Sequence, residues 1–157
     1  MSTFERFRLG RVALLDEPGL ALRGEKKLEK IPGILVIEDE KLLQDVIREA
    51  LNEGGFEVTM VRSGQEAVQM IEHGVSEYSA LVTDVNLEGA IKGWDIARLV
   101  RQLEPAFPVI YMTGAAADDW PSEGVPNSIL LKKPFAPAQL ITAVSQLLNA
   151  GSSTPTG

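Results

Sequence analysis

Cysteine is absent from this sequence, and its absence excludes several classes of protein. Disulfide scaffolds, thiolate zinc sites and cysteine nucleophiles all require it. Long apolar runs are also missing, since no stretch reaches the ~18 uninterrupted apolar residues of a membrane span. The first ten residues mix charges with two phenylalanines, where a secretory signal would have an apolar segment. We therefore expect a cytoplasmic protein with no membrane association.

Charge is distributed unevenly along the chain. The net charge is −7, yet residues 1–30 hold seven Lys and Arg against five Asp and Glu, which leaves eight against seventeen in residues 31–157. The first part is therefore +2 and the remainder −9. A phosphate backbone would repel so acidic a body. We expect metal or protein partners and no direct binding of nucleic acid.

Five short apolar segments predict the strands of a sheet. They are residues 34–37, 56–61, 80–85, 109–112 and 128–131. Helical patterns separate most of them, as in successive βαβ units. Four of the five are almost continuously apolar, which is typical of strands covered on both faces. The sequence thus predicts an open α/β fold with a parallel sheet.

Helices are expected where apolar residues recur at helical spacing. They are predicted at residues 42–51, after a capping box formed by Ser63 and Glu66, at residues 96–103 and at residues 137–149. Residues 113–124 are rich in alanine and contain a proline, so the element there should be short or irregular.

The strands and helices together predict one folded domain, residues 30–150. Residues 1–29 lack a sustained apolar period and are expected to form a flexible extension. The tail, residues 151–157, contains only Gly, Ser, Thr and Pro and is expected to be disordered. Only eight residues follow Asn149, so no output domain is expected after the folded one.

Polar side chains follow four of the predicted strands. Glu38 and Asp39 come after the first segment, and Asp84 ends the third. Thr113 follows the fourth segment and Lys133 follows the fifth. In open parallel sheets the carboxyl ends of the strands form one edge, where ligands bind. These five side chains should therefore lie close together.

Each of these groups has a simpler interpretation when it is taken alone. An acidic cluster after a strand commonly opens a helix. A single aspartate can belong to a turn, a threonine can cap a helix, and a lysine can be a solvated surface charge. Their joint occurrence at four strand ends favours a site for a metal ion and a phosphoryl group.

The chemistry of such a site follows from its charges. Crowded carboxylates repel one another, and a hard divalent cation such as Mg²⁺ (or Mn²⁺) relieves that repulsion through oxygen ligands. Asp84 could then act as a nucleophile and form an aspartyl phosphate. Charge on the transferring phosphoryl group must be neutralised by the metal and an ammonium, with a hydroxyl donating to a further oxygen. Lys133 and Thr113 suit those two roles.

Four sequence stretches resemble the receiver domains of bacterial response regulators, and the resemblance covers residues 31–149. The stretches are ILVIEDE at 34–40, LVTDVNL at 81–87, PVIYMTG at 108–114 and LLKKPF at 130–135. The resemblance implies a flavodoxin-like, doubly wound, five-stranded parallel sheet of order 2-1-3-4-5 with helices on both faces. It also implies the stand-alone type of receiver in a two-component system.

Roles for single residues are implied by the same resemblance. Asp84 would be the phosphorylation site and also a metal ligand, and Asp39 would bind Mg²⁺ directly. Glu38 would act on the metal through water, and the backbone carbonyl of Asn86 would be a further ligand.

Thr113 would be the switch hydroxyl, and Lys133 would contact the phosphoryl group. The chain departs from the usual pattern in three ways. It has NLEGAIKG at residues 86–93 where Met-Pro often follows the acceptor, it has Glu38 in the acid pair, and it has Leu130 where an aromatic residue commonly couples to the switch.

The resemblance therefore implies a signalling module and not an enzyme, apart from slow self-catalysed phosphorylation and dephosphorylation. A sensor histidine kinase or a histidine phosphotransfer protein would supply the phosphoryl group, and a downstream protein would receive the signal by contact. One alternative is a phosphate sink without output. Another is a small-molecule phosphohydrolase with Asp84 as nucleophile, although no general acid stands two residues after it and the chain has no room for a cap. A third alternative is a pseudo-receiver, which binds partners without being phosphorylated. Such a protein would not need the complete set of acidic, Thr and Lys side chains.

Overall fold

The structure is a computed structural model that describes residues 31–152. Its strands are β1 Gly33–Ile37, β2 Glu57–Val61, β3 Ala80–Asp84, β4 Val109–Thr113 and β5 Ile129–Lys132. Its helices are α3 Lys41–Glu53, α4 Gly64–Gly74, α5 Gly93–Leu103, α6 Trp120–Glu123 and α7 Pro137–Ser152, with short 3₁₀ turns η1 Val75–Glu77 and η2 Ala117–Asp119. Residues 1–29 and most of the predicted tail lie outside the described residues.

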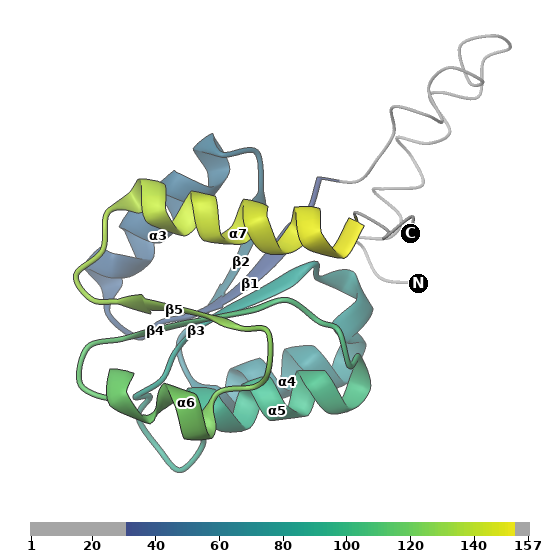
Figure 1. Ribbon diagram of the computed structural model, residues 1–157, viewed down its shortest axis with the longest axis vertical. Helices are drawn as coiled ribbons and strands as arrows, with labels where there is room; N and C mark the ends of the chain where they lie inside the picture. Colours follow the sequence, from purple (N-terminus) through teal and green to yellow (C-terminus); the bar gives the residue numbers. More distant parts are fainter. Residues whose placement is uncertain (1–30, 153–157) are drawn as a thin grey trace, which may run out of the picture. The chain divides into compact units, whose positions relative to one another are not determined.

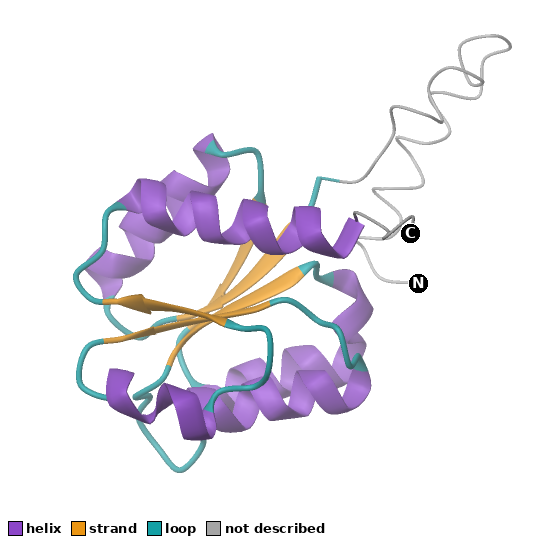
Figure 2. Ribbon diagram, viewed as in Figure 1, coloured by secondary structure: helices purple, strands orange, loops and turns teal. Residues whose placement is uncertain are grey.

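All five strands form one parallel sheet in the order β2-β1-β3-β4-β5. The predicted fold class and strand order are therefore confirmed. Figures 1 and 2 show α3 and α7 on one face of the sheet and α4, α5 and α6 on the other. The sheet is closed from water on both sides, as parallel sheets usually are.

Side chains that alternate along the strands belong to two apolar clusters, one on each face of the sheet. In β1, Leu35 and Ile37 belong to the cluster beneath α4 and α5, whereas Ile34 and Val36 belong to the one beneath α3 and α7. All four are at most 1% exposed. Full burial of one such side chain contributes about 1.5–3 kcal/mol, so the central strands are strongly held in place.

The helix ends follow the local sequence signals. Ser63 caps α4 and accepts a hydrogen bond from Glu66 N–H at 3.1 Å, as its spacing predicted. The predicted irregular element is the η2 turn followed by the four-residue α6. Helix α7 continues to Ser152, beyond its predicted end near Asn149, because no proline stands there to stop it and helix ends are poorly marked in sequence.

Strand register brings the polar strand ends to one edge of the sheet. Ile37, the last residue of β1, pairs with Thr83, directly before Asp84. Asp84 pairs with Met112, directly before Thr113, and Thr113 pairs with Lys132, directly before Lys133. The residues after β1, β3, β4 and β5 therefore lie at neighbouring positions along that edge.

Candidate functional site

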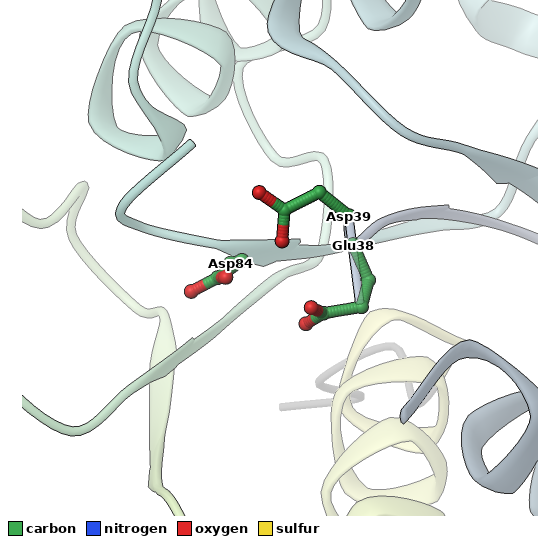
Figure 3. A group of neighbouring side chains, drawn as sticks. All are labelled: Glu38, Asp39 and Asp84. Atoms are coloured by element: carbon green, nitrogen blue, oxygen red, sulfur yellow. The ribbon is translucent and has the colours of Figure 1, made fainter. Parts of the chain in front are cut away.

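Three carboxyl groups converge where β1 and β3 end. Glu38 and Asp39 come from the connection between β1 and α3, and Asp84 is the last residue of β3. One oxygen from each lies within 4.8 Å of the others, and Figure 3 shows the three groups beside the ends of their strands. Glu38 is 1% exposed and Asp84 7% exposed, while Asp39 is half-buried. The cluster therefore places mutually repelling charges in a partly desolvated position.

Lys133 joins two of these carboxylates. Its ammonium lies 3.1 Å from Glu38 Oε1 and 3.2 Å from Asp84 Oδ2. Its backbone N–H also donates to Thr113 O at 3.0 Å, which keeps the chain after β5 against the end of β4. Lys132 is exposed, and Lys133 is the lysine whose ammonium contacts the carboxylates.

The pKa values of these groups show how their charges interact. Burial raises the pKa of Glu38, and the charge of Asp84 raises it further, against the lowering effects of Glu40 N–H and Lys133. Burial also raises the pKa of Asp84, although Lys133 opposes the change. Burial alone would lower the pKa of Lys133, but attraction to Asp84 and Glu38 outweighs it, so that pKa is raised. The single ammonium of Lys133 therefore does not neutralise all of the ionised carboxylates.

A cation such as Mg²⁺ fits this set of donors. Three carboxylates and a single ammonium leave two negative charges within a few ångströms. Oxygen ligands are those that Mg²⁺ prefers, and it commonly uses one or two carboxylates while keeping several waters. Asp39, half-buried and without a resolved ion pair to Lys133, has its carboxylate available for such an ion.

The backbone around Asp84 is tightly constrained. Its carbonyl oxygen accepts a hydrogen bond from the Thr83 hydroxyl at 2.8 Å. Gly93 approaches the same carbonyl so closely that a Cβ at this position would collide with it. The backbone N–H of Asn86 donates to the Asp84 carboxylate. The position of Asp84 is therefore fixed by its own strand, by the loop that follows and by the start of α5.

Thr113 is buried at the end of β4, at 1% exposed. Its hydroxyl accepts a hydrogen bond from Ala116 N–H at 3.1 Å, so in this structure it holds the start of the segment that leads to α6. The structure thus places Thr113 at the same edge as the acidic cluster, with its hydroxyl bonded to the following loop.

Tyr111, two residues before Thr113 in β4, binds the other end of the segment that contains α6. Its hydroxyl accepts a hydrogen bond from Val125 N–H at 3.0 Å, and its ring makes an edge contact with Trp94 at 4.6 Å between centroids. Leu130, on β5, is half-buried and packs against the same cluster. Tyr111 was not predicted to have a role, because its only signal in the sequence is a hydroxyl within an otherwise apolar strand.

Comparison with known proteins identifies the class. The profile of the response regulator receiver domain family matches residues 34–145. A solved response regulator receiver protein from Sinorhizobium medicae WSM419 is 45% identical, with a TM-score of 0.75, and the match covers 77% of this chain and 97% of that one. The receiver domain of a sensor histidine kinase from Pseudomonas aeruginosa PAO1, solved with a magnesium ion in its active site cleft, is 28% identical over 76% and 99% of the two chains, with a TM-score of 0.66.

Curated relatives agree with the solved structures. The transcriptional regulatory protein CusR of Escherichia coli strain K12 is 29% identical over 122 residues, which are 76% of this chain and 52% of that protein. The chain spans about half the length of the curated relatives it matches.

The parallel sheet, the acidic edge and these matches together place the protein in a family. The chain belongs to the response regulator receiver domains and is a receiver domain of two-component signalling. Receivers are a family of phospho-acceptors, and nothing in these matches favours the phosphohydrolase or phosphate-sink alternatives. No helix within residues 31–152 combines the length and apolar character needed to cross a membrane.

Proposed function

We propose that Asp84 accepts a phosphoryl group in a Mg²⁺-dependent reaction and that the signal leaves by contact with another protein. The observation that carries this proposal is the convergence of Asp84 with an acid pair and an ammonium. One carboxylate oxygen each from Glu38, Asp39 and Asp84 lie within 4.8 Å of one another, and Lys133 contacts Asp84 Oδ2 at 3.2 Å.

The transfer step forms one bond and breaks another. A carboxylate oxygen of Asp84 attacks phosphorus, and the bond from phosphorus to the donor atom breaks, with its electron pair leaving on the donor. The product is an acyl phosphate on Asp84. For a sensor histidine kinase or a phosphotransfer protein, the donor atom is an imidazole nitrogen, and membership of the receiver family supports such a donor.

Side chains of this chain would hold the reacting groups. Asp39 and Asp84 would ligate Mg²⁺, Glu38 would act through a bound water, and the carbonyl of Asn86 would complete the protein's share of ligands. Bound Mg²⁺ supplies charge neutralisation for the incoming phosphoryl oxygens. Glu38 is 1% exposed and both of its carboxylate oxygens are bonded, Oε1 to Lys133 at 3.1 Å and Oε2 to Glu40 N–H at 3.0 Å, which supports its indirect role.

Lys133 and Thr113 would stabilise the product. The ammonium of Lys133, already beside Asp84, would move its contact from the carboxylate to a phosphoryl oxygen. The Thr113 hydroxyl would donate to another phosphoryl oxygen, and its bond to Ala116 N–H would be strained or lost as it turns. Because Leu130 has no ring to reorient, we infer that the change reaches the surface through residues 114–124 and 86–93.

The test is chemical labelling of the purified chain. Incubation with acetyl phosphate and Mg²⁺ should add the mass of one phosphoryl group, and the gain should vanish in Asp84→Asn and in EDTA. Asp45→Asn is a matched control, because Asp45 is an exposed carboxylate on α3 in pairs with Lys41 and Arg48. Labelling that persists in Asp84→Asn, or that does not depend on the metal, would show that another group is the acceptor.

A further inference from the structure

A buried glutamine lies directly behind the acidic connection. Gln44 is on α3, is 6% exposed, and shares the inner face of the helix with Ile47 and Leu51, which are completely buried. Its side-chain Nε2 donates a hydrogen bond to the backbone carbonyl of Glu38 at 2.5 Å. A glutamine on an apolar helix face costs free energy to bury unless its amide is bonded, so this contact explains how the residue is accommodated.

Gln44 holds the acidic connection at two points. Only three residues separate β1 from α3, and Glu40 at the start of the helix provides no side-chain cap. The backbone N–H of Gln44 donates to Glu40 O at 2.9 Å, while its side chain holds Glu38 O. The residue between these two anchor points is Asp39.

The bond to Glu38 O has a direct effect on Asp39. A peptide unit is planar, so fixing the carbonyl oxygen of Glu38 also fixes the direction of the Asp39 N–H and the position of its Cα. The Glu38 side chain is held separately, by Lys133 at 3.1 Å and by Glu40 N–H at 3.0 Å. The peptide that Gln44 holds therefore sets the backbone position from which the Asp39 carboxylate extends.

We propose that Gln44 is a positioning residue for the metal ion, which sets the affinity of the acidic site by orienting Asp39 towards Glu38 and Asp84. This inference rests on the proposed metal-dependent function and extends it to a residue with no ligand atom in the cluster. Groups that hold metal ligands in place commonly change the affinity about 10–100-fold when they are removed. For a backbone contact one bond away from the ligand residue, the expected change is at the lower end.

A purely structural role for Gln44 makes a different prediction. If the amide only satisfied a buried carbonyl, its loss would lower stability and leave the affinity for Mg²⁺ unchanged. A positioning role predicts weaker Mg²⁺ binding in a protein that remains folded. It also predicts that saturating Mg²⁺ restores the rate of phosphorylation, because the acceptor and Lys133 are not altered.

The experiment compares Gln44→Met with the unaltered chain. Methionine is close to glutamine in size and has no N–H to donate. Mg²⁺ titrations followed by tryptophan fluorescence or amide NMR should give about tenfold weaker binding. Phosphorylation by acetyl phosphate should slow by a similar factor at low Mg²⁺ and recover within about twofold at saturation. Ile47→Val is the matched control, since it destabilises the same face of the same helix without touching the connection.

A second variant keeps the test possible if Gln44→Met does not fold. Gln44→Asn keeps the amide and withdraws it by one methylene, so it should weaken Mg²⁺ binding to a similar extent. Unchanged affinity in a folded Gln44 variant, or an equal loss in Ile47→Val, would overturn the positioning role.

The unaltered chain provides the separate test of the proposed function. If it binds Mg²⁺ and Asp84 is not phosphorylated, the acceptor role fails while the titrations still decide the role of Gln44. If it does not bind Mg²⁺, the metal site and the role of Gln44 both fail before any variant is made.

Discussion

Replacing Lys133 by methionine should destabilise the protein mainly when no metal is present. Its ammonium lies 3.1 Å from Glu38 and 3.2 Å from Asp84, whose side chains are 1% and 10% exposed. At an effective dielectric constant of about 20, Coulomb's law gives roughly 5 kcal/mol for each contact before desolvation is counted. Removing one partner of a buried ion pair typically costs about 3–5 kcal/mol. Because the Lys133 side chain is 26% exposed, we expect about 3 kcal/mol.

The assay is thermal or urea unfolding of Lys133→Met in EDTA and in Mg²⁺. For a domain of this size, a loss of about 3 kcal/mol lowers the Tm by roughly 10 °C. Mg²⁺ should stabilise the variant more than the unaltered chain, since no ammonium then competes with the ion for the carboxylates. Lys132→Met is the control, because Lys132 is the exposed neighbour in sequence.

The same variant should regain stability as the pH falls. The pKa values of Glu38 and Asp84 are already raised by burial, and losing the ammonium removes an interaction that lowers both. An acid whose pKa is higher in the folded state binds its proton more tightly there, so folding gains stability below that pKa and loses it above. The deficit should therefore shrink from pH 7.5 towards pH ~4.5. Equal stability of the variant and the unaltered chain in EDTA at pH 7.5 would refute the electrostatic reasoning.

Three further predictions concern the rest of the chain. Tyr111→Phe should cost about 1–2 kcal/mol and speed hydrogen exchange at Val125, because a buried N–H loses its acceptor; unchanged exchange there would contradict the role of the hydroxyl. Beryllofluoride with Mg²⁺ should shift backbone amides in residues 114–124, and changes confined to residues 129–131 would show a route through β5 instead. Removing residues 1–29 should leave a cooperative melt with a similar Tm, whereas an insoluble product would show that they pack on the domain.

Much of the fold could be predicted from local sequence because each strand is marked by a short apolar run. Residues 80–85 predicted β3 within one residue, and the Ser63 cap predicted the start of α4. Strand order could not be derived in this way, because every parallel arrangement of five buried strands shows the same apolar runs. It came from the resemblance to receiver domains, and the observed order agrees with it.

The site was predicted less completely than the fold. Charged residues at strand ends are conspicuous, so Glu38, Asp39, Asp84 and Lys133 could be found by position alone. Gln44 could not be found in this way, since its role depends on a bond to a backbone carbonyl. Every residue has such a carbonyl, so the sequence does not show which one is bonded. One signal was present, because Gln44 occupies the helix face of the buried Ile47, where a polar residue needs a partner.

The close approach of Gly93 to the Asp84 carbonyl brings the two ends of the loop between them together. Gly93 N–H donates to Val85 O at 2.9 Å, and Val85 N–H donates to Met112 O at 3.1 Å, so both ends of the loop are fastened to the sheet. Between these ends, Asn86 N–H donates to the Asp84 carboxylate and Leu87 is 2% exposed in the core, whereas residues 88–90 of the loop are exposed at the surface. Substitutions at the exposed residues 88–90 can therefore alter the surface beside Asp84 while the two ends of the loop keep their bonds to the sheet.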